Sequence, residues 1–462
     1  KEIFISDMKK VFAFSDGYKD FLSACKTERE CTEFVAEEIE KQGYKNIDEL
    51  IAKNGKLKAG DKVYANNMGK GIAMFQIGSE PFESGMSILG AHIDSPRLDL
   101  KQNPLYEDTD LAMFETHYYG GIKKYQWTAR PMAIHGVICK ADGTKVKISI
   151  GEDPEDPVLG VSDLLIHLAG KQMDKKGSVV VEGEDLNVLL GSIPVKEKKN
   201  AKDEDKEKEP VKAMILKILK DKYGVEDADF ESSELEIVPA GPARDYGLDR
   251  SMIMSYGHDD RVCAYPSYKA MLDLPKKTEK TCVCLLVDKE EIGSMGATGM
   301  QSMFFEDIVA EVMNLCGEYS ELGLRRAFRN SKMLSSDVSA AFDPNYPSVM
   351  EKNNCAYLGK GPVFCKYTGA RGKAGSNDAN AEYISEIRSI FNKDDVSYQT
   401  GELGKVDEGG GGTIAYIMAN YGMNVIDSGV AVLNMHAPNE IISKADIFEA
   451  FKGYVSFLKN IK

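Results

Sequence analysis

Short apolar runs that end in acidic residues or histidine recur along the chain, and they constrain its fold more than any other feature. SILGAHI (Ser87–Ile93) and TCVCLLV (Thr281–Val287) are apolar at nearly every position. Such runs are typical of strands that are buried on both faces of a parallel sheet. Segments with helical spacing, such as Glu28–Gln42 and Ala445–Leu458, lie around these runs. Strands that alternate with helices predict an α/β fold with a doubly wound, mostly parallel sheet.

The middle of the chain has a different pattern. It carries short segments that indicate β-strands, such as Lys145–Ile150 and Ser178–Val181. We therefore predict an α/β domain in two pieces, residues 1–100 and 241–462. A second, mostly β domain is predicted as an insertion at residues 101–240.

Composition and charge argue against several classes of function. The 462 residues carry a net charge of -15, which disfavours binding to nucleic acid phosphates or to an anionic membrane surface. No apolar stretch approaches the length of a membrane span, and the start KEIFISDMKK lacks the apolar core of a signal peptide. The nine cysteines form no CxxC pair and suggest no disulfide framework, which favours a reducing, cytoplasmic setting.

The residues that end the apolar runs are metal ligands by type. The runs end in His92 and Asp94, in His258, Asp259 and Asp260, in Asp288, Glu290 and Glu291, in Asp337, and in His436 and Glu440. Ligands of such sheets bind beyond the carboxyl ends of the strands, so we expect several of these side chains to meet at one edge. Imidazole with carboxylate suits zinc, cobalt or manganese, whereas calcium and magnesium prefer oxygen ligands alone. The set contains no cysteine, which argues against a structural zinc site.

Each of these residues also has a simpler interpretation. A lone histidine is more often structural than a ligand, and a glutamate pair often lies on an exposed face. The shared position at strand ends favours metal binding for His92, for Glu290 with Glu291, and for His436. The run GGGGT (Gly409–Thr413) is not followed by the residues of a phosphate loop, so it predicts a close backbone approach to substrate or metal.

Five segments, in order along the chain, carry a family resemblance: HIDSPRLDLKQNPLYED, GHDDR, DKEEIGSMGATG, SSDVSAAFDPNYP and NMHAPNE. They resemble the aspartyl aminopeptidases, family eighteen of the metallopeptidases, within the clan of two-zinc aminopeptidases. The resemblance implies an enzyme that releases N-terminal residues from peptides and holds two divalent ions, zinc with cobalt or manganese as alternatives. GHDDR and GARGKAGSNDA depart from the family pattern, so a preference for Asp or Glu and a broader or neutral specificity both stay open.

The resemblance implies a role for each ligand. His92 and Asp337 would hold one ion, Glu291 and His436 would hold the other, and Asp259 would bridge the two. A bridging carboxylate suits ions that lie roughly 3.5–4 Å apart. The adjacent Asp260 would then be a structural acid.

Two further carboxylates would serve the reaction. Glu290 would be the general base, provided that its strand ends there so that both glutamates reach one site. Asp94 follows His92 by two residues, a spacing that on a strand points both side chains the same way. Its carboxylate would accept the second ring N–H of His92 and orient the imidazole. The simpler interpretation of Asp94 is a turn residue before Ser95 and Pro96.

His167 and Lys366 are the remaining candidates. His167 lies in SDLLIHLAG, whose apolar surroundings suggest a half-buried structural histidine. The resemblance implies instead that it reaches the active site of a neighbouring subunit, within a homo-oligomer that is often a tetrahedral dodecamer. Lys366 would pair with an acidic substrate side chain, and its simpler interpretation is a solvated lysine. A catalytically silent metal-binding scaffold is the alternative of another class, and the presence of a candidate base at Glu290 weighs against it.

Overall fold

A computed structural model describes residues 2–196 and 207–462, with side chains from Asp7 onward. The chain divides into two compact units. The first unit consists of Lys1–Ser95, Ala243–Met435 and Glu440–Lys462. The second consists of Pro96–Pro242 together with the short stretch His436–Asn439, which the sequence pattern had placed with the α/β domain. Each unit is described by itself.

A nine-stranded sheet forms the centre of the first unit. Its order is β1 (Lys45–Asn46), β2 (Lys62–Asn66), β3 (Ile72–Gln76), β14 (Thr281–Val287), β4 (Met86–His92), β15 (Lys332–Ser335), β19 (Asn424–Gly429), β17 (Val363–Cys365) and β18 (Gln399–Thr400). The four strands β14, β4, β15 and β19 are parallel neighbours, whereas β3 and β17 flank them in antiparallel pairing. The predicted α/β class with a mostly parallel central sheet is confirmed.

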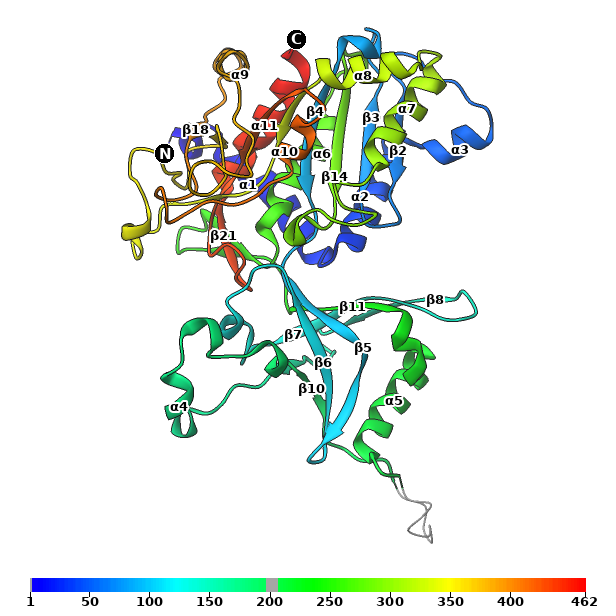
Figure 1. Cartoon of the computed structure of the whole chain (residues 1–462), viewed down its shortest axis with the longest axis vertical. Coiled ribbons are helices and arrows are strands. Elements are labelled where there is room, and N and C mark those ends of the chain that lie inside the picture. Colours follow the sequence, from blue (N-terminus) through cyan, green and yellow to red (C-terminus); the bar gives the residue numbers. More distant parts are fainter. Residues whose placement is uncertain (1, 197–206) are drawn as a thin grey trace. The chain divides into compact units, whose positions relative to one another are not determined.

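Helices cover both faces of this sheet because the buried strands alternate their side chains between two cores. In β14, Cys282, Cys284 and Leu286 join one hydrophobic cluster, and Val283 and Leu285 join the other. The first cluster includes residues of α1 (Glu2–Ala24), α2 (Glu28–Lys41), α6 (His258–Leu272), α9 (Ala381–Lys393) and α11 (Lys444–Asn460). The second includes residues of α3 (Ile47–Ala52), α7 (Phe304–Cys316), α8 (Glu321–Asn330) and α10 (Ala415–Ala419). Figure 1 shows these helices beside the strands.

Strand register places the ends of the central strands together. His92 of β4 pairs with Val287 of β14, and Ser335 of β15 pairs with Gly90 of β4 and with Asp427 of β19. Because the strands are parallel, the residues that follow them all leave the sheet at one edge. This edge carries most of the residues singled out in the sequence.

A smaller sheet in the first unit was not predicted. Its five strands are β12 (Arg244–Tyr246), β13 (Met252–Ser255), β21 (Glu440–Ser443), β20 (Ala431–Leu433) and β16 (Ser339–Ala340). The segment 424–434 is divided between the two sheets, because β19 pairs within the large sheet and β20 pairs within the small one.

The second unit is built on a seven-stranded sheet whose pairs are all antiparallel. The order is β8 (Lys145–Ile150), β7 (Met132–Cys139), β11 (Ser233–Pro239), β5 (Arg97–Asp108), β6 (Leu111–Tyr119), β10 (Val188–Gly191) and β9 (Gly160–Val161). Helix α5 (Pro210–Tyr223) belongs to the same unit as this sheet (Figure 1). The mostly β character predicted for the middle of the chain is confirmed.

The expected strand at Ser178–Val181 was a wrong prediction. The short 3-10 helix η4 (Gly177–Val179) occupies this segment. The side-chain amide of Gln172 donates to the carbonyl oxygen of Val180 at 3.2 Å. This local hydrogen bond satisfies a carbonyl that would otherwise accept from a neighbouring strand. In the described part of the chain, no helix combines the length and the apolar character needed to cross a bilayer.

Candidate metal centre

The candidate centre lies at the carboxyl ends of three central strands of the first unit. His92 is the last residue of β4, and Asp337 follows β15 by two residues. Glu290 and Glu291 begin the 3-10 helix η8 (Glu290–Ile292), which follows β14. Asp259 and Asp260 lie in the first turn of α6.

His92 is surrounded by carboxylates. Its Nε2 lies 3.0 Å from Asp259 Oδ1, 3.8 Å from Asp337 Oδ1 and 3.8 Å from Glu290 Oε2. The imidazole is fully buried, and burial alone would lower its pKa. The nearby carboxylates, Asp259 first and then Asp337 and Asp94, outweigh burial and raise the pKa of His92 well above its ordinary value. The site therefore gathers more negative charge than one imidazole can balance, which is the electrostatic setting of a cation site.

The donor atoms fit a divalent ion of the zinc type. One ligand atom from each of His92, Asp260 and Asp337 lies within 4.8 Å of the others, and the same holds for His92, Glu290 and Glu291. Imidazole with carboxylate is the donor set that zinc, cobalt and manganese accept. Both groups include His92, so the candidate positions for a cation lie around this imidazole.

Glu290 and Glu291 reach the same site because the chain turns sharply after β14. Lys289 and Gly293, on either side of η8, both adopt left-handed backbone conformations, with φ of 67° and 89°. The condition set from the sequence, that the strand ends before the two glutamates, is met. Burial, and next the charge of Asp337, raise the pKa of Glu290 to about 8.

Asp94 lies in the loop after β4 rather than on the strand, and it contacts both His92 and the following glutamates. Its Oδ1 is 3.3 Å from His92 Nδ1, and its backbone carbonyl is 3.0 Å from the same nitrogen. The two carboxylate oxygens accept hydrogen bonds from the backbone N–H groups of Glu290 at 3.1 Å and Glu291 at 3.2 Å. Asp94 thus links the imidazole to the turn that carries both glutamates.

Asp259 and Asp260, in the first turn of α6, make different contacts. Asp259 turns its carboxylate toward His92 Nε2, and its backbone N–H donates to Glu440 Oε2 at 3.0 Å. Asp260 Oδ2 accepts a hydrogen bond of 3.3 Å from the backbone N–H of His92. Burial, and then Asp337, raise the pKa of Asp260 well above its ordinary value. Asp260 contributes a donor atom to the cluster, which the sequence reasoning did not assign to it.

Three other residues that end apolar runs have structural partners. His258 is buried and lies 2.9 Å from the Tyr18 hydroxyl and 3.2 Å from the Ile253 carbonyl. Asp288 accepts a 2.5 Å hydrogen bond from Thr298 Oγ1. Glu440 holds the backbone of Asp259, a role that the sequence could not indicate because β21 is distant in the chain.

His436 lies in the short stretch that groups with the second unit. It has a positive φ of 63°, and its Nδ1 is 2.7 Å from the carbonyl oxygen of Gly121, which belongs to the same unit. A backbone carbonyl at Nδ1 fixes the ring and leaves Nε2 as the nitrogen that can bind an ion. Its assignment as a ligand stays a prediction.

His167 is exposed, so the simpler expectation of a half-buried histidine is wrong. It lies in the 3-10 helix η3 (Ile166–Leu168) of the second unit. The apolar side chains beside it are exposed as well, with 70% for Ile166 and 67% for Leu168. The leucine and isoleucine side chains around His167 therefore do not pack into the core of this chain.

Lys366 follows β17 and forms an ion pair with Asp378, which Lys373 also contacts at 3.1 Å. The hydrogen bond from Lys366 lowers the pKa of Asp378 despite its slight burial. The glycine run lies beside this segment, since Gly411 N–H donates to the Thr368 carbonyl at 3.1 Å. A Cβ at Gly410 would lie 2.5 Å from Ala370 Cα, so the glycines permit close approach to a neighbouring loop of the protein.

Both the sequence and the fold of this chain are similar to those of known proteins. The family model for aminopeptidase I zinc metalloproteases (M18) matches residues 21–458. A probable M18 family aminopeptidase 1 of Clostridium acetobutylicum is 66% identical over 453 residues, which cover 98% of this chain and 96% of that protein. The crystal structure of an M18 family aminopeptidase of Thermotoga maritima superposes with a TM-score of 0.93 at 42% identity, covering 99% of each chain.

A more distant structure shares the fold alone. It is the mApe1 dodecamer of S. cerevisiae, with a TM-score of 0.75, 20% identity and 96% of each chain covered. The family match and the close relatives extend over nearly the whole sequence. This chain therefore belongs to the M18 family of aminopeptidases, which are zinc metalloproteases.

Proposed function

We propose that this protein is a two-zinc aminopeptidase that releases the N-terminal residue of peptides. The observation that carries the proposal is the placement of Nε2 of His92 within 4 Å of carboxylates from α6, η8 and the end of β15. Cobalt or manganese would suit the same donors.

The proposed ligand set follows the position of each donor. His92 and Asp337 would hold one ion, Glu291 and His436 would hold the other, and Asp259 would lie between them. When bound, the two ions would lower the pKa of a water molecule and polarise the scissile carbonyl. Asp260 would support His92 through the backbone hydrogen bond described above.

Glu290 would move the proton. Burial makes the carboxylate of Glu290 a stronger base than a solvated glutamate, and such a group can accept a proton from the attacking water and return it to the leaving amine. Asp94 would keep Glu290 in place, because its carboxylate holds the N–H groups of the turn while it orients the His92 ring.

The proposal covers two alternatives for the N-terminal residue that the enzyme prefers. Lys366 is a candidate to pair with Asp or Glu, but it already forms an ion pair with Asp378. An acidic substrate side chain would have to compete with this partner. A broad or neutral specificity is therefore retained as the second candidate.

We further propose a homo-oligomer, with a dodecamer as the assembly seen in the yeast relative. The exposed apolar side chains beside His167 support this proposal, since such side chains commonly mark contacts between proteins. His167 would then complete the site of a neighbouring subunit. All nine cysteines are free, which fits the cytoplasm as the proposed location.

The decisive experiment combines metal analysis with peptidase assays. The purified protein is assayed on Asp-, Glu- and Leu-terminated chromogenic peptides before and after chelation, and its zinc content is measured at each step. We expect two zinc ions per subunit, loss of all hydrolysis on chelation and recovery with zinc, cobalt or manganese. Full activity in a verified metal-free sample would refute the proposal, and bound zinc without hydrolysis of any peptide would favour a silent scaffold.

A further inference from the structure

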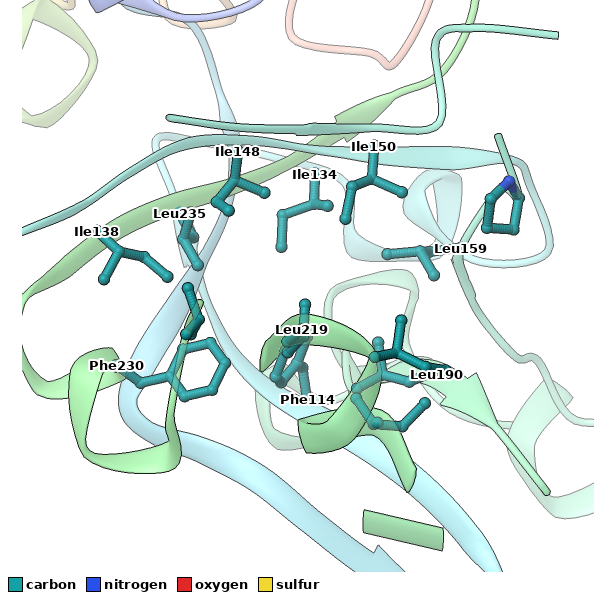
Figure 2. Close-up of a pocket in the computed structure, with 14 residues that line it drawn as sticks. Phe114, Ile134, Ile138, Ile148, Ile150, Leu159, Leu190, Leu219, Phe230 and Leu235 are labelled. Carbon is teal, nitrogen blue, oxygen red and sulfur yellow. The ribbon is translucent and has the colours of Figure 1, made fainter. Parts of the chain in front are cut away.

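The second unit contains an apolar pocket that the proposed peptidase chemistry does not use. Its volume is about 150 Å³, and all fourteen residues that line it are apolar. Figure 2 shows Ile134, Ile148 and Ile150 on one side, with Phe114, Leu190 and Leu219 opposite them. The pocket thus lies between strands of the seven-stranded sheet and helix α5 and is partly open to solvent.

The pocket has a buried end and an exposed end. Ile138, Ile148 and Phe230 are each at most 2% exposed, whereas Ile218 is 51% exposed and Pro157 is also exposed. All the lining residues belong to one unit, so the pocket exists without any contribution from the other. A small molecule can therefore enter from solvent at the mouth and reach the buried end.

The size of the pocket exceeds ordinary packing defects. Protein interiors leave few voids larger than a water molecule, and an apolar void offers water no hydrogen-bond partner. The side chains around such a void lack the dispersion contacts that a hydrocarbon would supply. In another protein, a dry cavity of about this volume, lined by leucine, isoleucine and phenylalanine, binds benzene and xenon.

We infer that this pocket is a binding site for a small uncharged hydrocarbon group, a ring or short chain of about six to eight carbons. A charged group is excluded because none of the lining side chains could pair with a buried ammonium or carboxylate. A charged ligand would have to keep its charges in water outside the apolar lining, so the inference is limited to uncharged groups. The inference is independent of the metal centre.

The first test uses the full-length protein with isotope-labelled isoleucine methyl groups, titrated with toluene. We expect saturable shifts of the methyl signals of lining isoleucines such as Ile134, Ile138 and Ile148. Phenylalanine and hexanoate, whose charged groups must stay in water, should bind more weakly than toluene. A crystal pressurised with xenon should show density at the buried end. No saturable shift with toluene, or equal binding of phenylalanine, would overturn the inference.

The second test fills the pocket. Ile215 lines it from α5 and is only partly buried, so Ile215→Phe should fold while occupying space that the ligand needs. We expect the Kd for toluene to rise by at least about tenfold, a difference that titration resolves readily. Val179→Phe is the matched control, because Val179 is a 45% exposed side chain of the same unit that does not line the pocket. An unchanged Kd in a folded Ile215→Phe protein, confirmed by a normal melting curve, would show that toluene binds elsewhere.

Discussion

The carboxylate of Asp94 accepts a hydrogen bond of 3.1 Å from the backbone N–H of Glu290, although these two residues belong to loops that follow different strands. The contact exists because β4 and β14 are parallel neighbours with His92 opposite Val287. Asp94 therefore contacts both the proposed ligand His92 and the turn that carries the proposed base.

Asp94→Asn tests this link. An asparagine keeps one carbonyl oxygen as an acceptor but loses the second one and the negative charge beside His92. Loss of a group that supports a ligand typically lowers activity or metal affinity by about 10–100-fold, and we expect kcat or zinc affinity to fall in that range. The exposed Asp48→Asn is the control. Normal turnover and normal zinc content in Asp94→Asn would show that the link has no functional role.

Glu290→Gln separates proton transfer from metal binding. The substitution keeps the shape of the side chain and removes its capacity to accept a proton. We expect kcat to fall by about 10²–10⁴ while zinc content is retained. Glu291→Gln should instead lose zinc, since Glu291 is proposed as a ligand. Near-normal turnover of Glu290→Gln would exclude Glu290 as the base.

Lys366→Ala tests specificity against its ion-pair partner. If Lys366 receives acidic side chains, kcat/KM for Asp-terminated peptides should fall relative to Leu-terminated peptides. Asp378→Asn removes the competing carboxylate and should shift the same ratio in the opposite direction. Equal changes for both classes of peptide in the Lys366→Ala protein would show that this lysine does not select substrates.

His167→Ala tests the proposed contribution from a neighbouring subunit. His167→Ala and Glu290→Gln proteins, each nearly inactive alone, should regain activity when they are co-assembled. Mixed oligomers would contain some sites with an intact Glu290 and an intact His167 from the neighbour. No recovery in verified mixed oligomers, or full activity of a stable monomer, would exclude the role of His167 across subunits.

The buried carboxyl group of Asp446 should make the free energy of unfolding depend on pH, separately from the metal centre. Its buried carboxylate accepts hydrogen bonds from Gly359 N–H at 2.8 Å and Gly361 N–H at 2.7 Å, yet burial raises its pKa to about 7. An acid with a raised pKa in the folded state stabilises the fold below its unfolded pKa, and this contribution is lost as pH rises through 7.

Relative to Asp446→Asn, the wild type should therefore lose up to about 4 kcal/mol of unfolding free energy between pH 4 and pH 8. Urea unfolding of both proteins at several pH values measures this difference. A difference that does not vary with pH would mean that the Asp446 carboxyl group does not titrate in this range.

Part of the site was predictable because residue type and strand ends are local properties. The apolar runs before His92, Glu290 and Asp337 identified strands, and parallel strands bring their ends to one edge. The second contact of Asp94 was not predictable, since it depends on which strand lies beside β4. The exposure of His167 was not predictable either, because apolar residues that adjoin it in the sequence can lie either in a core or on an exposed surface.

The pairing of β4 with β15 brings together the two ends of a long stretch of sequence. During synthesis, His92 leaves the ribosome long before Asp337 exists, and the stretch Pro96–Pro242 of the second unit is made between them. A nascent chain that stops before β15 has only part of the donor set. The complete proposed donor set therefore exists only after β15 has joined the large sheet. Zinc binding would then mark a late stage of folding in the cell.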